Sequence, residues 1–177
     1  MAKEEQSRRS FMGVATVAIG AVIGAVMAVP LVRFFFHPAG RTVVTSGSGA
    51  VDAVAFDKLA AGADPQKVVL VASGVRDAWA SADEVRLGAA WVQRTADGEV
   101  SAFTTACPHL GCSIDFDPAK KKFVCPCHRS AFGLDGARIE GPSKRGLDPL
   151  PVQVVEGRVM ITHKRFIADT SDRVEKA

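Results

Sequence analysis

Two short segments carry most of the information about how this chain folds: Cys107-Pro108-His109-Leu110-Gly111-Cys112 and Cys125-Pro126-Cys127-His128-Arg129-Ser130. Together they hold all four cysteines and two of the four histidines of a 177-residue sequence, so their clustering is more informative than their number. Each segment offers a cysteine and a histidine at loop spacing, as Cys-x-His and Cys-x-x-His. Two thiolates and two imidazoles around one site admit either zinc or an iron-sulfur cluster, and the spacing alone leaves both open.

Each segment also contains an additional cysteine, Cys112 in the first and Cys127 in the second. A ligand set of two cysteines and two histidines leaves one matched pair that could close a disulfide between the two loops. Disulfides form and persist in exported proteins, so an exported domain would permit that oxidation.

These residues resemble the Rieske [2Fe-2S] family, in particular the disulfide-containing type found in quinol:cytochrome c oxidoreductases, whose motifs are C-T-H-L-G-C and C-P-C-H-G-S. The resemblance implies one [2Fe-2S] cluster per chain, with Cys107 and Cys125 as ligands of one iron and His109 and His128 as ligands of the other. It also implies that the two imidazoles contact quinol and accept its proton when the iron accepts its electron, which would make them the catalytic residues.

The resemblance assigns roles to neighbouring positions as well. It pairs Cys112 with Cys127 in a disulfide between the loops, and it makes Leu110 an apolar cover over the site. Ser130 stands where the family has a hydroxyl that donates a hydrogen bond to a bridging sulfide and raises the potential. Phe132 stands where many high-potential members carry a tyrosine, and the chain contains no tyrosine. We therefore expect a lowered potential, which suits a menaquinol rather than a ubiquinol donor.

The sequence departs from the family pattern at two loop positions. Pro108 replaces the usual threonine and stiffens the first loop. Arg129 replaces a glycine, and we expect its φ to be negative, where a side chain is comfortable. Gly141 and Pro142 resemble the start of a third, proline-containing loop that shields the cluster, although the fuller G-P-x-P form is absent.

Residues 11–36 are predicted to form a transmembrane anchor. The run from Phe11 to Val32 has no ionisable side chain and would span about 33 Å as a helix, which is enough to cross a bilayer once. A core helix of a soluble protein is the competing interpretation. Residues 1–10 form the predicted cytoplasmic tail, in which Arg8 and Arg9 resemble a twin-arginine export signal and also fit the positive-inside rule. We expect an uncleaved, single-pass anchor in a bacterial cytoplasmic membrane, with the rest of the chain on the outer, periplasmic side.

The remainder of the chain predicts an all-β, antiparallel Rieske-type head. Residues 37–50 end in a Gly/Ser tract and predict a flexible tether, while residues 51–168 form the head, with its cluster-binding part inserted at about 104–145. A loose polar tail is expected at 169–177. Short apolar runs bounded by turn residues predict strands at 67–72, 89–95, 100–105, 122–125, 150–156 and 158–163.

Two brief helices are also expected in the head, around 54–61 and 75–84. His163 follows a predicted strand and is expected at the surface, whereas Trp91 is expected in the core or at its boundary.

Composition excludes several other classes of protein. With 47% hydrophobic and 23% charged residues the chain is not intrinsically disordered. A net charge of +3, from 22 basic and 19 acidic residues, is too balanced for a nucleic-acid binder.

The sequence therefore predicts the Rieske subunit of a membrane quinol:cytochrome c oxidoreductase. Its partners would be a cytochrome b-type membrane subunit, a c-type cytochrome, quinol and membrane lipid. One alternative keeps the cluster but makes the chain the exported electron-relay subunit of an arsenite-oxidase-like molybdenum enzyme. A remote alternative is a structural zinc module without a redox role.

Overall fold

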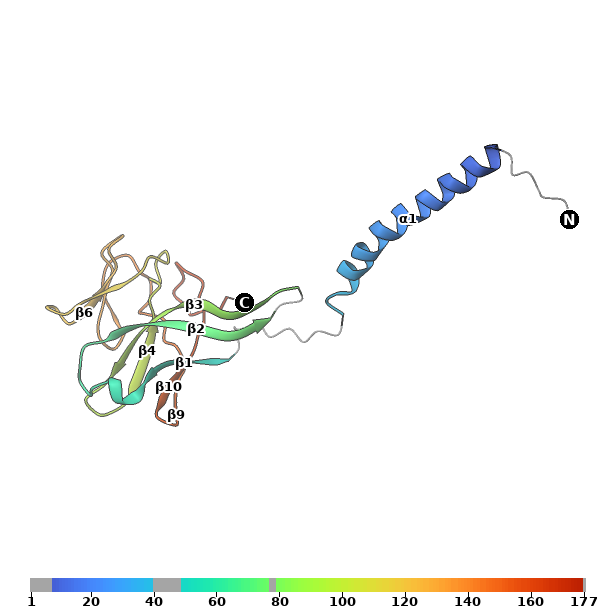
Figure 1. Cartoon of the computed structure of the whole chain (residues 1–177). Coiled ribbons are helices and arrows are strands. Elements are labelled where there is room, and N and C mark those ends of the chain that lie inside the picture. Colours follow the sequence, from blue (N-terminus) through green and yellow to red (C-terminus); the bar gives the residue numbers. More distant parts are fainter. Residues whose placement is uncertain (1–7, 40–48, 77–78, 177) are drawn as a thin grey trace. The chain divides into compact units, whose positions relative to one another are not determined.

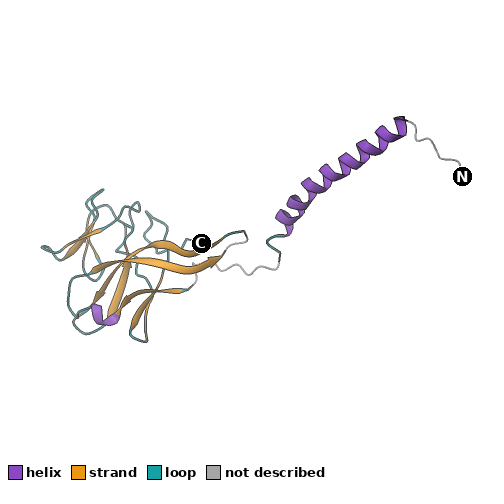
Figure 2. Ribbon diagram, viewed as in Figure 1, coloured by secondary structure: helices purple, strands orange, loops and turns teal. Residues whose placement is uncertain are grey.

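A computed structural model describes residues 8–39, 49–76 and 79–176 of the chain. It separates a unit that contains a long helix from a β-rich unit, called the head below. Figure 1 follows the chain through both units, and Figure 2 distinguishes the helix from the strands. Each unit is described by itself.

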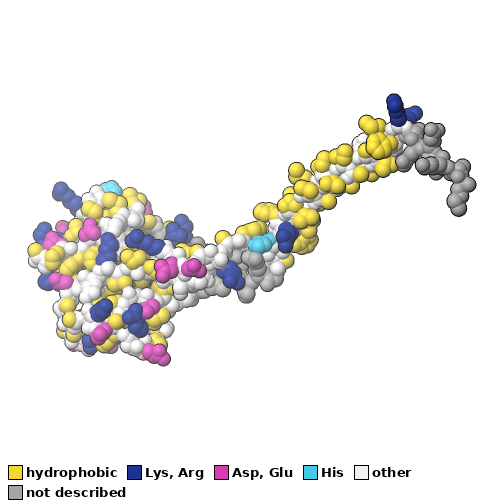
Figure 3. Space-filling model, viewed as in Figure 1, with side chains coloured by type: hydrophobic (Ala, Val, Ile, Leu, Met, Phe, Trp, Pro, Cys, Tyr) yellow, Lys and Arg dark blue, Asp and Glu magenta, His cyan; other side chains and the backbone are white. Residues whose placement is uncertain are grey.

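Helix α1 spans Arg8–Phe36 and is 29 residues long. Its most apolar window has a mean hydropathy of 2.3, and none of its residues is buried, so its apolar side chains are exposed along its whole length (Figure 3). The helix is therefore long and apolar enough to cross a membrane, as the sequence predicts. Most of the predicted tether, residues 40–48, lies outside the described residues.

The base of the head consists of two three-stranded sheets. One has the order β1-β10-β9, and its strands are Ala50–Ala55, Arg158–Thr162 and Val152–Val155. The other has the order β2-β3-β4, and its strands are Gln66–Arg76, Ser81–Arg94 and Val100–Thr104. Leu70 and Ala72 on β2 are buried whereas Val69 and Val71 are exposed, which is the alternation of a sheet with one face on a core. That core also contains Val92, Val159 and Ile161.

A smaller sheet with the order β5-β6-β7-β8 is inserted between β4 and β9. Its strands are antiparallel and span Asp115–Asp117, Lys122–Val124, Ala131–Phe132 and Arg138–Glu140. It has a core of its own, in which the ring of Phe123 packs with its centroid 5.6 Å from that of Trp91 and 6.3 Å from that of Phe103. Trp91 joins this core to the loop before β5, because its Nε1 donates a hydrogen bond of 3.1 Å to the carbonyl of Ile114. The all-β head with an inserted subdomain is thus confirmed.

Each of the six predicted strands overlaps an observed strand. Of the two predicted brief helices, the one around 54–61 is reduced to one 3-10 turn and the one around 75–84 is wrong. Around 54–61 the structure has the end of β1 and a short 3-10 turn at Phe56–Lys58. Within 75–84 the described residues lie in β2, in β3 and at the turn between them. This hairpin continues beyond the buried core, so pairing between its strands, rather than a hydrophobic pattern, sets its conformation.

The expectation of a loose C-terminal tail is also wrong. The chain doubles back after β10, because the amide of Ile167 donates to the carbonyl of Val174 at 2.9 Å and the amide of Lys176 donates to the carbonyl of Arg165 at 2.7 Å. Polar residues here indicated a solvated end, yet backbone hydrogen bonds hold the segment to the head.

Candidate metal centre

The two Cys/His segments form loops with the same backbone hydrogen bonds. In the first, the amide of Cys107 donates to the carbonyl of Cys112 and the amide of Gly111 donates to the carbonyl of Cys107, both at 2.8 Å. In the second, the amide of Cys125 donates to the carbonyl of Ser130 at 2.8 Å, and the amide of Arg129 donates to the carbonyl of Cys125 at 3.0 Å. Both loops are therefore closed by the same tight turn.

This turn explains why the expected φ of Arg129 is wrong. Gly111 and Arg129 each stand four residues after the first cysteine of their loop, and their φ angles are +80° and +60°. The position closes the turn in the left-handed region, which favours glycine and strains an arginine. The side chain of Arg129 is exposed, so burial of its methylene groups does not compensate for the free-energy cost of this backbone conformation.

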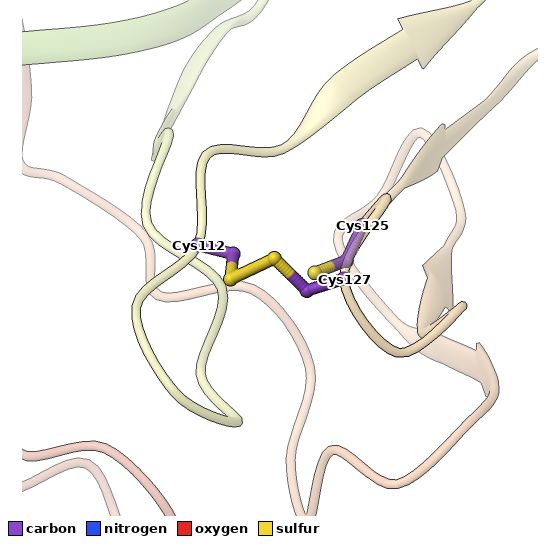
Figure 4. A group of neighbouring side chains, drawn as sticks. All are labelled: Cys112, Cys125 and Cys127. Atoms are coloured by element: carbon purple, nitrogen blue, oxygen red, sulfur yellow. A yellow bond between two sulfur atoms is a disulfide. The ribbon is translucent and has the colours of Figure 1, made fainter.

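The structure separates the four cysteines into two pairs. Cys112 and Cys127 form a disulfide that joins the tips of the two loops, in agreement with the pairing that the resemblance implies (Figure 4). Cys107 and Cys125 are free thiols that are 2% and 1% exposed. The sulfur of Cys125 lies within 4.8 Å of both disulfide sulfurs, but disulfide sulfurs are not thiolates and cannot serve as metal ligands in that form.

The surroundings of the free thiols suit a pair of metal ligands. Burial, together with the neighbouring thiol of Cys125, raises the pKa of Cys107 to about 11. Such a thiol stays protonated in the absence of a cation, and a bound metal ion displaces the proton and compensates the thiolate charge.

The two histidines of the loops lie side by side. The ring centroids of His109 and His128 are 4.8 Å apart, with the rings edge to face. Nδ1 of His109 is buried and has no hydrogen-bond partner among the described residues, which is rare for a buried nitrogen and fits one that binds a metal. His128 is exposed, so one imidazole of the pair is open to a molecule that docks on the loops.

A third loop packs against the second one, as the sequence suggested. Gly141 has a φ of +96°, and a Cβ at this position would collide with the Cα of Ser130. Ser130 is fully buried, and its Oγ accepts a hydrogen bond from the amide of Ser143 at 3.2 Å. Pro142 and Leu110, which were expected to cover the site, are both exposed, Leu110 at 59%. Phe132 is fully buried in the hydrophobic cluster that contains Cys107 and Cys125.

Sequence reasoning missed the buried ion pair behind these loops. Arg145 and Asp148 are almost completely buried and form two hydrogen bonds of 2.8 Å. Asp148 raises the pKa of Arg145 above its ordinary value. The spacing of three residues between Arg145 and Asp148 was the only sign of an ion pair in the sequence. The same spacing is common in solvated turns, so it did not indicate that this pair is buried.

The fold and the paired loops define a class of small β-domain metalloproteins, and comparison with known proteins specifies which one. Residues 67–156 match the Rieske [2Fe-2S] domain, and residues 1–36 match the ubiquitinol-cytochrome c reductase Fe-S subunit TAT signal. The chain belongs to the Rieske [2Fe-2S] family. The cofactor is therefore a [2Fe-2S] cluster, and the twin-arginine signal is confirmed.

Relatives of known function cover almost the whole chain. The chain is 32% identical over 163 residues to the menaquinol:cytochrome c reductase iron-sulfur subunit of Geobacillus thermodenitrificans, which covers 90% of this chain and 92% of that protein. It is 30% identical over 159 residues to the cytochrome b6-f complex iron-sulfur subunit 2 of Trichormus variabilis, covering 88% and 84%. The crystal structure of a plasma membrane Rieske protein from Synechocystis matches 54% of this chain and 86% of its own, at 27% identity and a TM-score of 0.40.

Proposed function

We propose that this chain is the electron-transfer subunit of a membrane-bound menaquinol:cytochrome c oxidoreductase. Two menaquinol:cytochrome c reductase iron-sulfur subunits that resemble it, from Geobacillus thermodenitrificans and Bacillus subtilis, are 32% and 33% identical to it, over 92% and 90% of their own lengths. The observation that carries the proposal is the pair of loops that bury two free thiols, bring two imidazole rings together and leave His128 and Leu110 exposed.

The proposed ligands are Cys107 and Cys125 for one iron and His109 and His128 for the other. The buried thiols and the unpartnered Nδ1 of His109 support this set. When bound, the cluster supplies a one-electron acceptor whose potential is raised because two ligands are neutral imidazoles.

The exposed ring of His128 is the group that we expect to meet quinol. Its outer nitrogen can accept a hydrogen bond from a quinol hydroxyl and then take the proton, which leaves the quinol together with its electron. Exposed Leu110 gives the same surface an apolar contact for the quinol or for the membrane subunit that holds it. The catalytic part of the chain is thus the surface formed by the tips of the two loops.

The proposed orientation follows from α1 and the disulfide. Arg8 and Arg9 begin the helix and favour a cytoplasmic N-terminus, so the head would lie on the periplasmic side, where the disulfide between the loops is stable. The proposed partners are a cytochrome b-type membrane subunit and a c-type cytochrome. Residues 37–50 would serve as the tether between anchor and head.

Low-temperature EPR of reduced membranes tests this function, recorded with and without an inhibitor of the quinol oxidation site of cytochrome b complexes. A Rieske signal whose line shape changes with inhibitor is expected for wild type and for a control, His163→Gln, which leaves the loops intact. An unchanged Rieske signal would favour the relay subunit of an arsenite-oxidase-like enzyme. Absence of the signal from iron-replete protein would contradict both functions and favour zinc.

A further inference from the structure

The C-terminal segment 166–176, called the strap below, is a hairpin that reaches the cluster-binding loops. Phe166 and Glu175 pair in an antiparallel bridge, and the turn between them places Asp169 at a φ of +57°. A left-handed conformation costs free energy at a residue that is not glycine, so contacts of the strap must compensate for it.

Asp169 connects two of the three loops at the site. Its amide donates a hydrogen bond of 2.9 Å to the carbonyl of Pro108, the residue between Cys107 and His109. Lys144 of the third loop donates to the carbonyl of Asp169 at 3.0 Å and lies 3.2 Å from its carboxylate. One turn of the strap therefore fixes the spacing between the first and third loops.

Arg145 binds the strap through its guanidinium group. Besides its bonds to Asp148, its guanidinium donates to the carbonyl and the hydroxyl of Thr170 at 2.7 and 2.8 Å and to the carbonyl of Ile167 at 2.9 Å. The carbonyl of Asp148 in turn accepts a hydrogen bond of 2.9 Å from the amide of Thr104, just before the first loop. Because a fully used guanidinium fork orients its partners tightly, the contact is specific rather than a solvated tail lying on a surface.

The strap also walls a cleft behind the first loop. The cleft has a volume of about 340 Å³, and its lining includes Cys107 and Pro108 on one side and Phe166 and Ala168 of the strap on another. The strap therefore shares the lining of this cleft with Cys107, which is 2% exposed.

We propose that the strap is a positioning element of the redox site, with Asp169 and Arg145 as positioning residues that fix the first loop against the third and keep water from Cys107. This inference rests on the proposed ligand set, because the first loop matters only if it binds the cluster. It gives the end of the chain a role in the stability and electronic structure of the centre, although no residue of the strap is itself a proposed ligand.

The test compares three variants of the purified full chain in detergent with wild type. The first ends at Ala168; the second combines Lys144→Met with Thr170→Val, which loosens the strap but leaves Arg145 and Asp148 paired. The control, Glu175→Gln, removes only the ion pair with Lys164 at the far end of the strap. Each is measured for its EPR g-values, for the rate at which a chelator bleaches the cluster, and for far-UV circular dichroism to verify the β fold.

We expect the chelator to bleach the cluster about tenfold faster in the truncated chain and about threefold faster in the double variant, because these variants lose a few of the hydrogen bonds that support the loops. Their g-values should shift and their lines broaden, whereas the control should match wild type. Wild-type g-values and bleaching rates in a folded double variant would overturn the inference while leaving the proposed function intact. A wild-type chain without a Rieske signal would instead overturn the proposed function, and this inference with it.

Discussion

The backbone amide of Ser143 donates a hydrogen bond of 3.2 Å to Oγ of Ser130, and both residues are buried. This bond uses a lone pair of the hydroxyl and leaves its proton available for a second partner. The third loop therefore orients the Ser130 hydroxyl as a donor, and Gly141 permits the close approach that makes this possible.

Ser130→Ala is expected to lower the midpoint potential of the cluster. If the hydroxyl donates to a sulfide, it stabilises the more negative, reduced state, and its loss should cost about 60 mV, which corresponds to a tenfold change in a one-electron equilibrium. Redox titration followed by circular dichroism measures the shift. Ser113→Ala, on the exposed side of the first loop, is the control, and an unchanged potential in Ser130→Ala would contradict the role of the hydroxyl.

Phe132→Tyr is expected to raise the potential, by a similar mechanism. Phe132 is fully buried in the cluster of side chains that contains Cys107 and Cys125, so a phenol there could donate to a ligand sulfur. We expect a rise of some tens of millivolts, up to about 60 mV for one such bond. The control Phe116→Tyr places a phenol at the half-buried edge of the same cluster. Equal potentials in Phe132→Tyr and wild type would contradict the prediction that Phe132 lowers the potential of the cluster.

The loops were predictable from sequence because their chemistry is local. Each segment of six consecutive residues contains two of the proposed ligands, a further cysteine and the turn, and the resemblance to the Rieske family supplied the disulfide pairing that the structure shows. The sign of φ at Arg129 was predicted wrongly because the preference of a side chain for negative φ was weighed above the turn, and substituting a glycine does not change the turn that the backbone must make.

The strap was not predictable because the residues that it contacts are distant from it in sequence. Arg145 contacts Thr170, 25 residues away, and Asp169 contacts Pro108 across the whole cluster-binding subdomain. A polar segment with no hydrophobic period gives no local signal for such contacts, and composition alone indicates a solvated tail. The helix expected near 75–84 failed for a related reason, since cross-strand pairing overrides weak local preferences.

The disulfide is expected to stabilise the head by about 3 kcal/mol, because Cys112 and Cys127 are separated by 15 residues and their link restricts the unfolded chain. The double variant Cys112→Ser/Cys127→Ser should lower the free energy of unfolding by this amount. Urea unfolding followed by the fluorescence of buried Trp91 measures it. A reductant should shift the unfolding transition of wild type and leave that of the double variant in place. Equal stability of the disulfide-bonded wild type and the double variant would contradict the prediction.

His163 is expected to make the head less stable in mild acid. The residue is half-buried rather than at the surface, and Gly88 leaves room for its ring, since a Cβ there would lie 2.9 Å from Nε2. Burial, with a contribution from Arg165, lowers the pKa of His163 below its usual 6.5, so the folded state favours the neutral ring.

The contribution of neutral His163 to stability is complete above the unfolded pKa and is lost as the pH falls through about 6.5 toward the folded value. Between about pH 7 and about pH 5, the free energy of unfolding should therefore fall less in His163→Gln than in wild type. Parallel pH profiles for the two proteins would show that His163 titrates alike in the folded and unfolded chain.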